Sequence, residues 1–258
     1  MQLRRVLVAA LALATPALAS AQARSRLTVA VAANMKPAFE EIAARFQARH
    51  PGVEVESTYG ASGNFFAQIA NGAPFDLFLS ADAEYPAKVV EKGLADGKAF
   101  AYAYGKLVVW VPKDSKLDLE RKGLAALTDP SVRRIAIANP DIAPYGRAAK
   151  SALEKAGLHG RLKDRIVMGQ SVSQAAQFVQ SGNAQVGLVS LSLAKTPPLS
   201  VEGRSYTVPP SSYERIEQAG VVLKGAREVA LARELAVFIV GDGAREVLER
   251  YGYDLPAR

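Results

Sequence analysis

The stretch LTVAVAANMKPAFEEIAARFQARH, residues 27–50, joins an apolar run to an amphipathic pattern. Its first seven residues, Leu27 to Ala33, are apolar or β-branched, which predicts a short buried strand. From Met35 to His50 apolar residues recur at helical spacing, and Pro51-Gly52 follows as a helix stop. The stretch therefore predicts a strand that leads directly into a helix, which is the repeating unit of α/β folds.

The same alternation continues toward the C-terminus. Further strands are predicted at 53–59, 76–80, 106–112, 134–138, 185–190 and 219–223, and further helices at 64–70, 84–92, 123–128, 147–156, 172–181, 227–240 and 244–251. Residues 60–63, GASG, are predicted to form a turn. Strands that alternate with helices indicate parallel sheets with helices on their faces, so we expect an α/β fold.

Two β-rich segments, near 101–111 and 206–222, are candidates for hinges between two lobes. Lobe boundaries at these segments place 24–104 with 216–258 in the first lobe and 105–215 in the second. The first lobe would then be built from both ends of the chain. A ligand cleft between the lobes is consistent with this arrangement.

The N-terminus has the three parts of a secretory signal peptide. Arg4 and Arg5 form a positive region, Val6 to Leu13 is apolar, and small residues up to Ala23 provide an A-x-A cleavage site. The apolar run is shorter than the roughly 20 residues that span a bilayer. We therefore predict cleavage of residues 1–23 and export to the periplasm. Because that segment carries two arginines and no acid, the net charge falls from +7 to +5.

The amino-acid composition excludes several classes of catalytic and metal-binding site. The 258 residues include no cysteine and only two histidines, His50 and His159, which excludes thiolate catalysis, cysteine metal sites and a three-histidine zinc site. Nothing resembles a nucleophile elbow, and no acid–base constellation lies near the loops, so an enzyme is not expected. Basic residues are interleaved with acidic ones and form no long run, so nucleic-acid binding is not expected either.

Four loops share one arrangement, in which a strand ends and small or polar residues introduce a helix. They contain Ala33-Asn34, 60–64, 144–146 and 171–173. Ligands of open α/β sheets bind beyond the carboxyl ends of the strands, and a helix N-terminus there presents unpaired N–H groups and a positive dipole end. Each loop by itself is more often structural, since serine and asparagine cap many helices. Together they supply neutral donors only, which favours an anion held without a counter-charge.

Four segments resemble the periplasmic molybdate-binding proteins: Leu27–Ala43, Tyr59–Asp82, Ala138–Leu153 and Glu246–Tyr253. The similarity covers essentially the whole chain after the signal peptide, and NGAPFDLFLSAD is its most specific part. Related sulfate and iron(III) binders share the fold but not this set of segments. The resemblance implies a two-lobed type II periplasmic-binding-protein fold with molybdate or tungstate buried between the lobes. It also implies a membrane permease of an ABC importer as the partner, and no cofactor.

The resemblance implies five ligand-binding residues that contact the oxygens of the oxyanion rather than the metal itself: Ala33, Asn34, Ser62, Tyr145 and Val172. Ser62 would donate its hydroxyl and backbone N–H, Asn34 its side-chain amide, and the other three their backbone N–H groups. Ser190 stands where some members of the family carry a tyrosine, so that phenol donor is missing here. Asn34 is expected to compensate, and no contact from Ser190 is expected.

Other functions remain open at this level. A binder of another anion such as sulfate or phosphate, or of iron(III), would share the fold. Iron(III) binders recruit tyrosines together with acids, but Tyr102 and Tyr104 are expected to pack on one face of a strand. A ligand-sensing regulator is disfavoured by the signal peptide and by the lack of a DNA-binding region. The signal peptide and the family resemblance together imply a monomeric periplasmic protein that captures molybdate or tungstate by closing two lobes around it.

Overall fold

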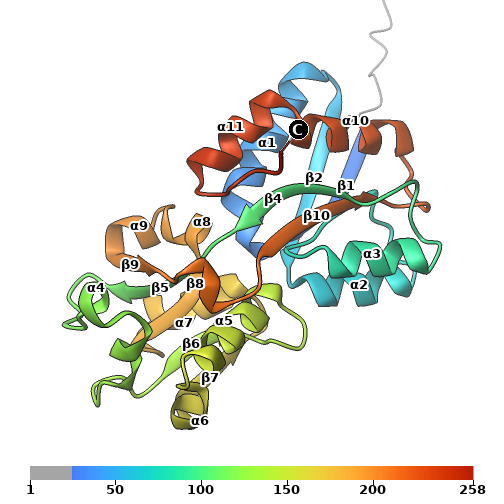
Figure 1. The fold of residues 1–258 in the computed structure, drawn as a ribbon. Helices are drawn as coiled ribbons and strands as arrows, with labels where there is room; N and C mark the ends of the chain where they lie inside the picture. Colours follow the sequence, from blue (N-terminus) through green and yellow to red (C-terminus); the bar gives the residue numbers. More distant parts are fainter. Residues whose placement is uncertain (1–24, 258) are drawn as a thin grey trace, which may run out of the picture.

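The computed structural model describes residues 25–257, so the signal peptide expected at 1–23 lies outside the described residues. Two five-stranded sheets, each packed against helices, form the two halves of the molecule (Figure 1). We call the half built on the first sheet lobe 1 and the half built on the second sheet lobe 2. No helix in the described part of the chain has the length and apolar character needed to cross a membrane. The expected two-lobed α/β fold is confirmed.

The sheet of lobe 1 has the strand order β2-β1-β3-β10-β4. Its strands are β1 (Ser25–Ala32), β2 (Val53–Gly60), β3 (Leu77–Leu79), β4 (Phe100–Gly105) and β10 (Ile216–Val222). β1 pairs in parallel with β2 and β3, whereas β10 is antiparallel to β3 and β4. The expectation of parallel sheets is therefore wrong for β10, which returns from lobe 2 instead of following a helix of lobe 1.

Side chains of β1 alternate between two apolar layers. Leu27, Val29 and Val31 belong to the layer on one face of the sheet, and Ala30 belongs to the layer on the other. The first face is covered by α1 (Lys36–Arg49), α10 (Val229–Val240) and α11 (Asp242–Arg250), and the second by α2 (Ser62–Ala70) and α3 (Glu84–Glu91) (Figure 1). Because both faces are covered, the strand is an almost continuous apolar run, and each large apolar side chain buried there contributes about 1.5–3 kcal/mol.

The sheet of lobe 2 has the order β7-β6-β8-β5-β9 and is also mixed. Its strands are β5 (Leu107–Pro112), β6 (Ile135–Ala138), β7 (Ile166–Gly169), β8 (Val186–Ser190) and β9 (Gly203–Thr207). Its helices are α4 (Leu119–Lys122), α5 (Pro144–Lys155), α6 (His159–Leu162), α7 (Val172–Gln180), α8 (Leu191–Ala194) and α9 (Leu199–Glu202). Short 3₁₀ turns occupy Ala33–Met35, Gly123–Thr128, Lys163–Arg165 and Pro210–Ser212. The core of lobe 2 surrounds Trp110, whose indole N–H donates to the carbonyl of Leu199 at 3.1 Å.

The chain passes between the lobes within the two segments expected to be hinges. β4 ends at Gly105 and β5 begins at Leu107, so a single residue joins the two sheets. The return path leaves β9 and reaches β10 through the 3₁₀ turn Pro210–Ser212. A Cβ atom on Gly105 would lie 2.2 Å from the hydroxyl oxygen of Tyr145, so only glycine lets the first crossing approach lobe 2 this closely.

Two helices begin earlier than the sequence pattern indicates. α2 begins at Ser62, inside the predicted turn 60–63, and α5 begins at Pro144 rather than at 147. Ala61 and Ala143 each have extended backbone, so the chain enters the helix at the next residue. Proline suits the first helical position because the N–H it lacks would have no partner there. The earlier starts place Ser62 and Tyr145 in the first turns of their helices.

Candidate functional site

A small cavity lies between the lobes at the carboxyl ends of several strands. Its lining residues are Ala32, Ala33, Asn34, Gly60, Ala61, Ser62, Ala81, Ala143, Pro144, Tyr145, Ser171 and Val172. All five residues expected to bind the ligand are therefore brought together, three from lobe 1 and two from lobe 2. The cavity is the place where an enclosed ligand would contact both lobes at once.

Three helices point their N-terminal ends at this cavity. Ser62 is the first residue of α2, Val172 is the first of α7, and Tyr145 follows Pro144 in α5. N–H groups in a first helical turn have no partner within the helix. In α7 the side chain of Ser171 caps the N–H of Gln174 at 3.3 Å, which leaves the N–H of Val172 for another acceptor. Such converging N-termini form an anion site by their N–H groups and dipoles.

The hydroxyl of Ser62 adds a side-chain donor. Its oxygen accepts a hydrogen bond from the backbone N–H of Ala81 at 2.9 Å, and the residue is only 1% exposed. Since that bond occupies a lone pair of the oxygen, the hydroxyl hydrogen is free to point at an acceptor in the cavity. Ser62 can thus offer its hydroxyl and its backbone N–H to the same ligand, the two donors that the family resemblance implies.

The side chain of Asn34 differs from the expectation. Its amide nitrogen donates to Oε1 of Gln218 at 3.0 Å and to the hydroxyl oxygen of Tyr253 at 2.9 Å, so both amide hydrogens are engaged inside lobe 1. Its Oδ1 is buried without a hydrogen-bond partner among the described residues. In this structure Asn34 therefore does not present its amide hydrogens to the cavity, because Gln218 and Tyr253 supply the acceptors.

Ser190 does not line the cavity. It caps α8, where its hydroxyl oxygen accepts from the N–H of Leu193 at 3.4 Å, and it also bonds the hydroxyl of Ser192 at 3.1 Å. Ser192 in turn donates to the carbonyl of Asn34 at 2.9 Å. Ser190 and Ser192 therefore connect the start of α8 to Asn34 through hydrogen bonds.

The two lobes are closed against each other around the cavity. Hydrogen bonds cross between them from the N–H of Gly63 to the carbonyl of Ile142 at 2.9 Å, from the hydroxyl of Ser173 to the carbonyl of Ala33 at 3.2 Å, and from the hydroxyl of Tyr85 to the carbonyl of Asp141 at 3.4 Å. These contacts need both lobes in place. The structure therefore represents a closed conformation.

Electrostatically, the cavity is neutral. Its lining residues, named above, include no lysine, arginine, aspartate or glutamate. Burial raises the pKa of Tyr102, Tyr145 and Tyr253 above the ordinary value of tyrosine, so the three hydroxyls near the site stay protonated and uncharged. The donors of the cavity therefore act through partial charges alone.

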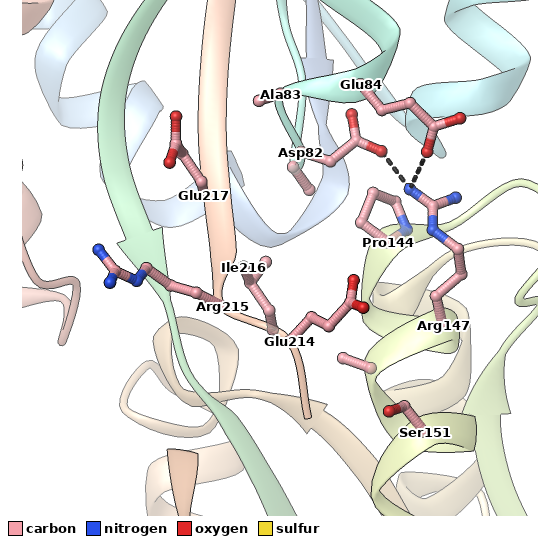
Figure 2. A pocket seen from close by; sticks show the side chains of 12 residues that line it. Asp82, Ala83, Glu84, Pro144, Arg147, Ser151, Glu214, Arg215, Ile216 and Glu217 are labelled. Atoms are coloured by element: carbon pink, nitrogen blue, oxygen red, sulfur yellow. Dashed lines mark hydrogen bonds and ion pairs between the residues drawn. The ribbon is translucent and has the colours of Figure 1, made fainter. Parts of the chain in front are cut away.

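Charged residues lie instead in a neighbouring hollow at the mouth of the cleft (Figure 2). There Arg147 of α5 forms an ion pair with Asp82 and lies 3.5 Å from Oε2 of Glu84, which joins lobe 2 to lobe 1. Burial is the largest single effect and acts to lower the pKa of Arg147, but Asp82, Tyr85 and Glu84 together outweigh it and the pKa is raised. Arg147 therefore stays charged and holds the two lobes together from outside the neutral cavity.

Substitution of Gly63 by alanine is expected to hinder lobe closure. A Cβ atom there would lie 2.5 Å from the hydroxyl oxygen of Tyr85 and 2.9 Å from the carbonyl oxygen of Ile142 across the cleft. Slight opening relieves the clash, so we expect a cost near the lower end for overpacking, about 1 kcal/mol or about fivefold in ligand affinity. Titration calorimetry measures the affinity, and small-angle scattering measures the shift toward an open form. Unchanged affinity would contradict the closed geometry.

The residues that bond Asn34 are not among those predicted from the sequence. Gln218, Tyr253 and Ser192 are 0%, 4% and 2% exposed and bond its side chain or its carbonyl. Of these three residues, Tyr253 alone lies within a segment that resembles the family, Glu246–Tyr253. A buried glutamine in a strand has no distinctive sequence pattern, so Gln218 could be found only from the structure.

Comparisons with known proteins identify the family of the chain. The family model described as bacterial extracellular solute-binding protein matches residues 27–254. Molybdate-binding protein ModA of Azotobacter vinelandii is 39% identical over 95% of this chain and 96% of its own length. Molybdate-binding protein ModA of Rhodobacter capsulatus is 41% identical over 92% of this chain and 91% of its own length.

A solved structure, that of the periplasmic molybdate-binding protein of Azotobacter vinelandii, has the same fold with a TM-score of 0.83. The alignment has 37% identity and covers 90% of this chain and 100% of that chain. The family model, the relatives and the fold agree over nearly the whole described chain. This protein is therefore a member of the bacterial extracellular solute-binding protein family.

Proposed function

We propose that this protein captures molybdate, and also tungstate, in the cavity between its lobes and delivers it to the permease of an ABC importer. One observation carries the proposal: the N-termini of α2, α5 and α7 and the hydroxyl of Ser62 converge on a cavity lined by no charged side chain. Each hydrogen bond to a charged group contributes about 1.5–3 kcal/mol, so several neutral donors hold a dianion. Exclusion of water strengthens them further.

Capture proceeds by closure of two lobes, formed by 24–104 with 216–258 and by 105–215. The chain crosses between the lobes at Lys106 and again just before Ile216, and these two crossings absorb the motion. The ligand favours the closed form because donors from both lobes, such as those of Ser62 and Val172, reach it only there. The ligand-binding set consists of Ala33, Asn34, Ser62, Tyr145 and Val172.

The identity of the ligand is inferred from the relatives and from the donor set. Both relatives described above are named molybdate-binding proteins. Sulfate is smaller, so a cavity sized for molybdate leaves it with stretched hydrogen bonds. Iron(III) requires anionic oxygen ligands, and the lining residues include no carboxylate. Tyr145, the one phenol in the lining, is held neutral by burial and bonds Gln218 instead.

The proposed cellular location follows from the N-terminal segment and from the family. Cleavage of residues 1–23 would release a periplasmic protein of 235 residues with a net charge of +5. We propose that it acts as a monomer, without cofactor or catalytic activity and without nucleic-acid binding. Its partners are then the oxyanion and the membrane permease.

Removal of the Arg147 side chain is expected to weaken molybdate binding by about 1.4- to 5-fold, because partly exposed ion pairs contribute about 0.2–1 kcal/mol. The loss arises from a less stable closed form, since Arg147 bonds Asp82 across the mouth of the cleft. Lys150→Ala serves as a matched control, because Lys150 pairs at 3.8 Å with Glu154 on the same helix and not across the cleft. Equal affinities of the two variants would refute this role of Arg147.

Isothermal titration of the ligand-free mature protein with molybdate, tungstate, sulfate and iron(III) citrate tests the proposal as a whole. We expect one-to-one binding of molybdate and tungstate and at least about 100-fold weaker binding of sulfate. Binding of sulfate alone would keep the fold and replace the ligand. Binding of iron(III) alone would reject the oxyanion site.

A further inference from the structure

A buried oxygen without a partner stands beside the proposed oxyanion site. Asn34 is 1% exposed and lines the cavity, and its Oδ1 makes no hydrogen bond within the described residues. An unsatisfied buried acceptor is destabilising, because it has lost its hydrogen bonds to water. Beside an anion the same oxygen would also repel the ligand, because both carry negative partial charge. An oxyanion in the cavity would therefore favour the opposite orientation of the Asn34 amide, with its nitrogen toward the ligand.

Gln218 holds the Asn34 amide in this orientation. It lies on β10 with its side chain fully buried, and its Oε1 accepts from Nδ2 of Asn34 at 3.0 Å and from the hydroxyl of Tyr102 at 3.2 Å. Its Nε2 donates to the hydroxyl oxygen of Tyr145 at 3.3 Å. Tyr145 belongs to α5 of lobe 2. A single glutamine thus connects a candidate donor of lobe 1 to a ligand-binding residue of lobe 2.

We propose that Gln218 is a positioning residue for oxyanion binding, and that the Asn34 and Gln218 amides turn over together when the ligand binds. This inference rests on the proposed function. After the turn, Nδ2 of Asn34 faces the oxyanion as a donor. Oδ1 of Asn34 then accepts from Nε2 of Gln218, and Oε1 of Gln218 accepts from the hydroxyl of Tyr145.

Every buried polar group keeps a partner in the turned arrangement. Tyr102 still donates to the carbonyl of Ser80, with which it bonds at 2.7 Å, and its oxygen accepts the second hydrogen of Nε2 of Gln218. The hydroxyl of Tyr253 moves its hydrogen from the carbonyl of Asn34 to Oδ1 of Asn34. Ser192 continues to donate to that carbonyl at 2.9 Å. The turn therefore removes the unsatisfied oxygen and creates no new one.

The turned arrangement depends on lobe closure, because the hydroxyl that donates to Gln218 comes from lobe 2. In an open form Tyr145 would move away from Gln218, so Oε1 of Gln218 would have no hydroxyl to accept from in the turned arrangement and would keep the acceptor role toward Asn34 that is seen here. Presentation of the Asn34 donor is thereby coupled to closure. A cation or a neutral ligand would gain nothing from the turn, so the pair favours anions.

Substitutions at position 218 test the coupling. A carboxylate only accepts hydrogen bonds, so Gln218→Glu pins Nδ2 of Asn34 away from the cavity, whereas Gln218→Met removes the connection without pinning. We expect Gln218→Met to weaken molybdate binding about threefold at pH 8. Gln218→Glu should weaken it at least about tenfold more, since a hydrogen bond to a charged group is lost. Gln68→Glu, which adds the same charge on an exposed position of α2, is the matched control.

Repetition in an Asn34→Ala background separates positioning from charge repulsion. If Gln218 acts through Asn34, the difference in molybdate affinity between Gln218→Glu and Gln218→Met shrinks in this background to the part caused by charge repulsion. Gln218→Met should then weaken molybdate binding less than twofold. The same gap in both backgrounds would overturn the proposal. Thermal unfolding of each variant checks that it is folded.

A measurement on the unsubstituted protein does not depend on variants that fold. ¹⁵N-edited NOE spectra report which hydrogens surround the Asn34 amide group. Without molybdate we expect cross-peaks from its amide hydrogens to the ring of Tyr253, and with molybdate we expect their loss and new cross-peaks from the Gln218 amide hydrogens to the ring of Tyr102. Unchanged cross-peaks in a protein that binds molybdate would reject the turn, whereas absence of molybdate binding would reject the proposed function.

Discussion

Replacement of Val172 by proline is expected to weaken molybdate binding by about 100-fold. It removes one hydrogen bond to a charged group, which contributes about 1.5–3 kcal/mol. It also places the proline ring where an oxygen of the oxyanion is expected. Val172 is the first residue of α7, where proline is well tolerated because that N–H has no helical partner. Ser171 already has extended backbone, with φ −144° and ψ 168°, as a residue before proline requires. The substitution thus removes a donor with little change to the helix.

Val172→Ala is the matched control, because it shortens the same buried side chain and keeps the N–H. Titration calorimetry with molybdate compares the two variants, and thermal unfolding compares their stability. We expect the alanine variant to bind within about threefold of the unsubstituted protein despite a lower unfolding temperature. If proline and alanine weaken binding equally, the N–H of Val172 is not a ligand donor.

Replacement of Ser62 by alanine is the second large effect, with molybdate binding weakened at least tenfold, as loss of a charged-group hydrogen bond of about 1.5–3 kcal/mol requires. The hydroxyl hydrogen is lost from the cavity, while the backbone N–H of Ser62 at the start of α2 remains. The N–H of Ala81 also loses its acceptor, so we expect a stability loss of about 1–3 kcal/mol with the fold retained.

Ser190→Ala is the comparison for Ser62→Ala. Ser190 is equally buried, lies at the end of β8 and caps a helix, but it does not line the cavity. Its loss should lower the unfolding temperature and leave the dissociation constant for molybdate within about twofold. An unchanged dissociation constant in Ser62→Ala, or an equal loss in both variants, would remove Ser62 from the site.

Much of the fold could be predicted because both sheets are covered by helices on their faces. Strands such as β1 and β8 are short apolar runs, and α7 has apolar residues at helical spacing, so the alternation of elements is visible in the sequence. The direction of β10 is not visible, since strand periodicity is the same in parallel and antiparallel pairs. The strand β7 was not predicted, because its run of four residues, IVMG, is short and only partly buried.

The candidate site could be predicted only as far as its donors lie at helix starts. Ala33, Ser62, Tyr145 and Val172 follow strand ends, where small and polar residues precede a helix. The state of Asn34 depends on Gln218 and Tyr253, which lie 184 and 219 residues away along the chain. Such long-range hydrogen bonds leave no local pattern, so the sequence could name Asn34 but not the direction of its amide group.

The position of the bound oxyanion is the central claim, and anomalous scattering measures it directly. A crystal of the mature protein grown with molybdate, with data collected on both sides of the molybdenum absorption edge, shows where the metal lies. We predict one peak between the lobes, with oxygens within hydrogen-bonding distance of the hydroxyl of Ser62 and the backbone N–H groups of Tyr145 and Val172. A peak in the charged hollow beside Arg147, or on the outer surface of either lobe, would contradict the account.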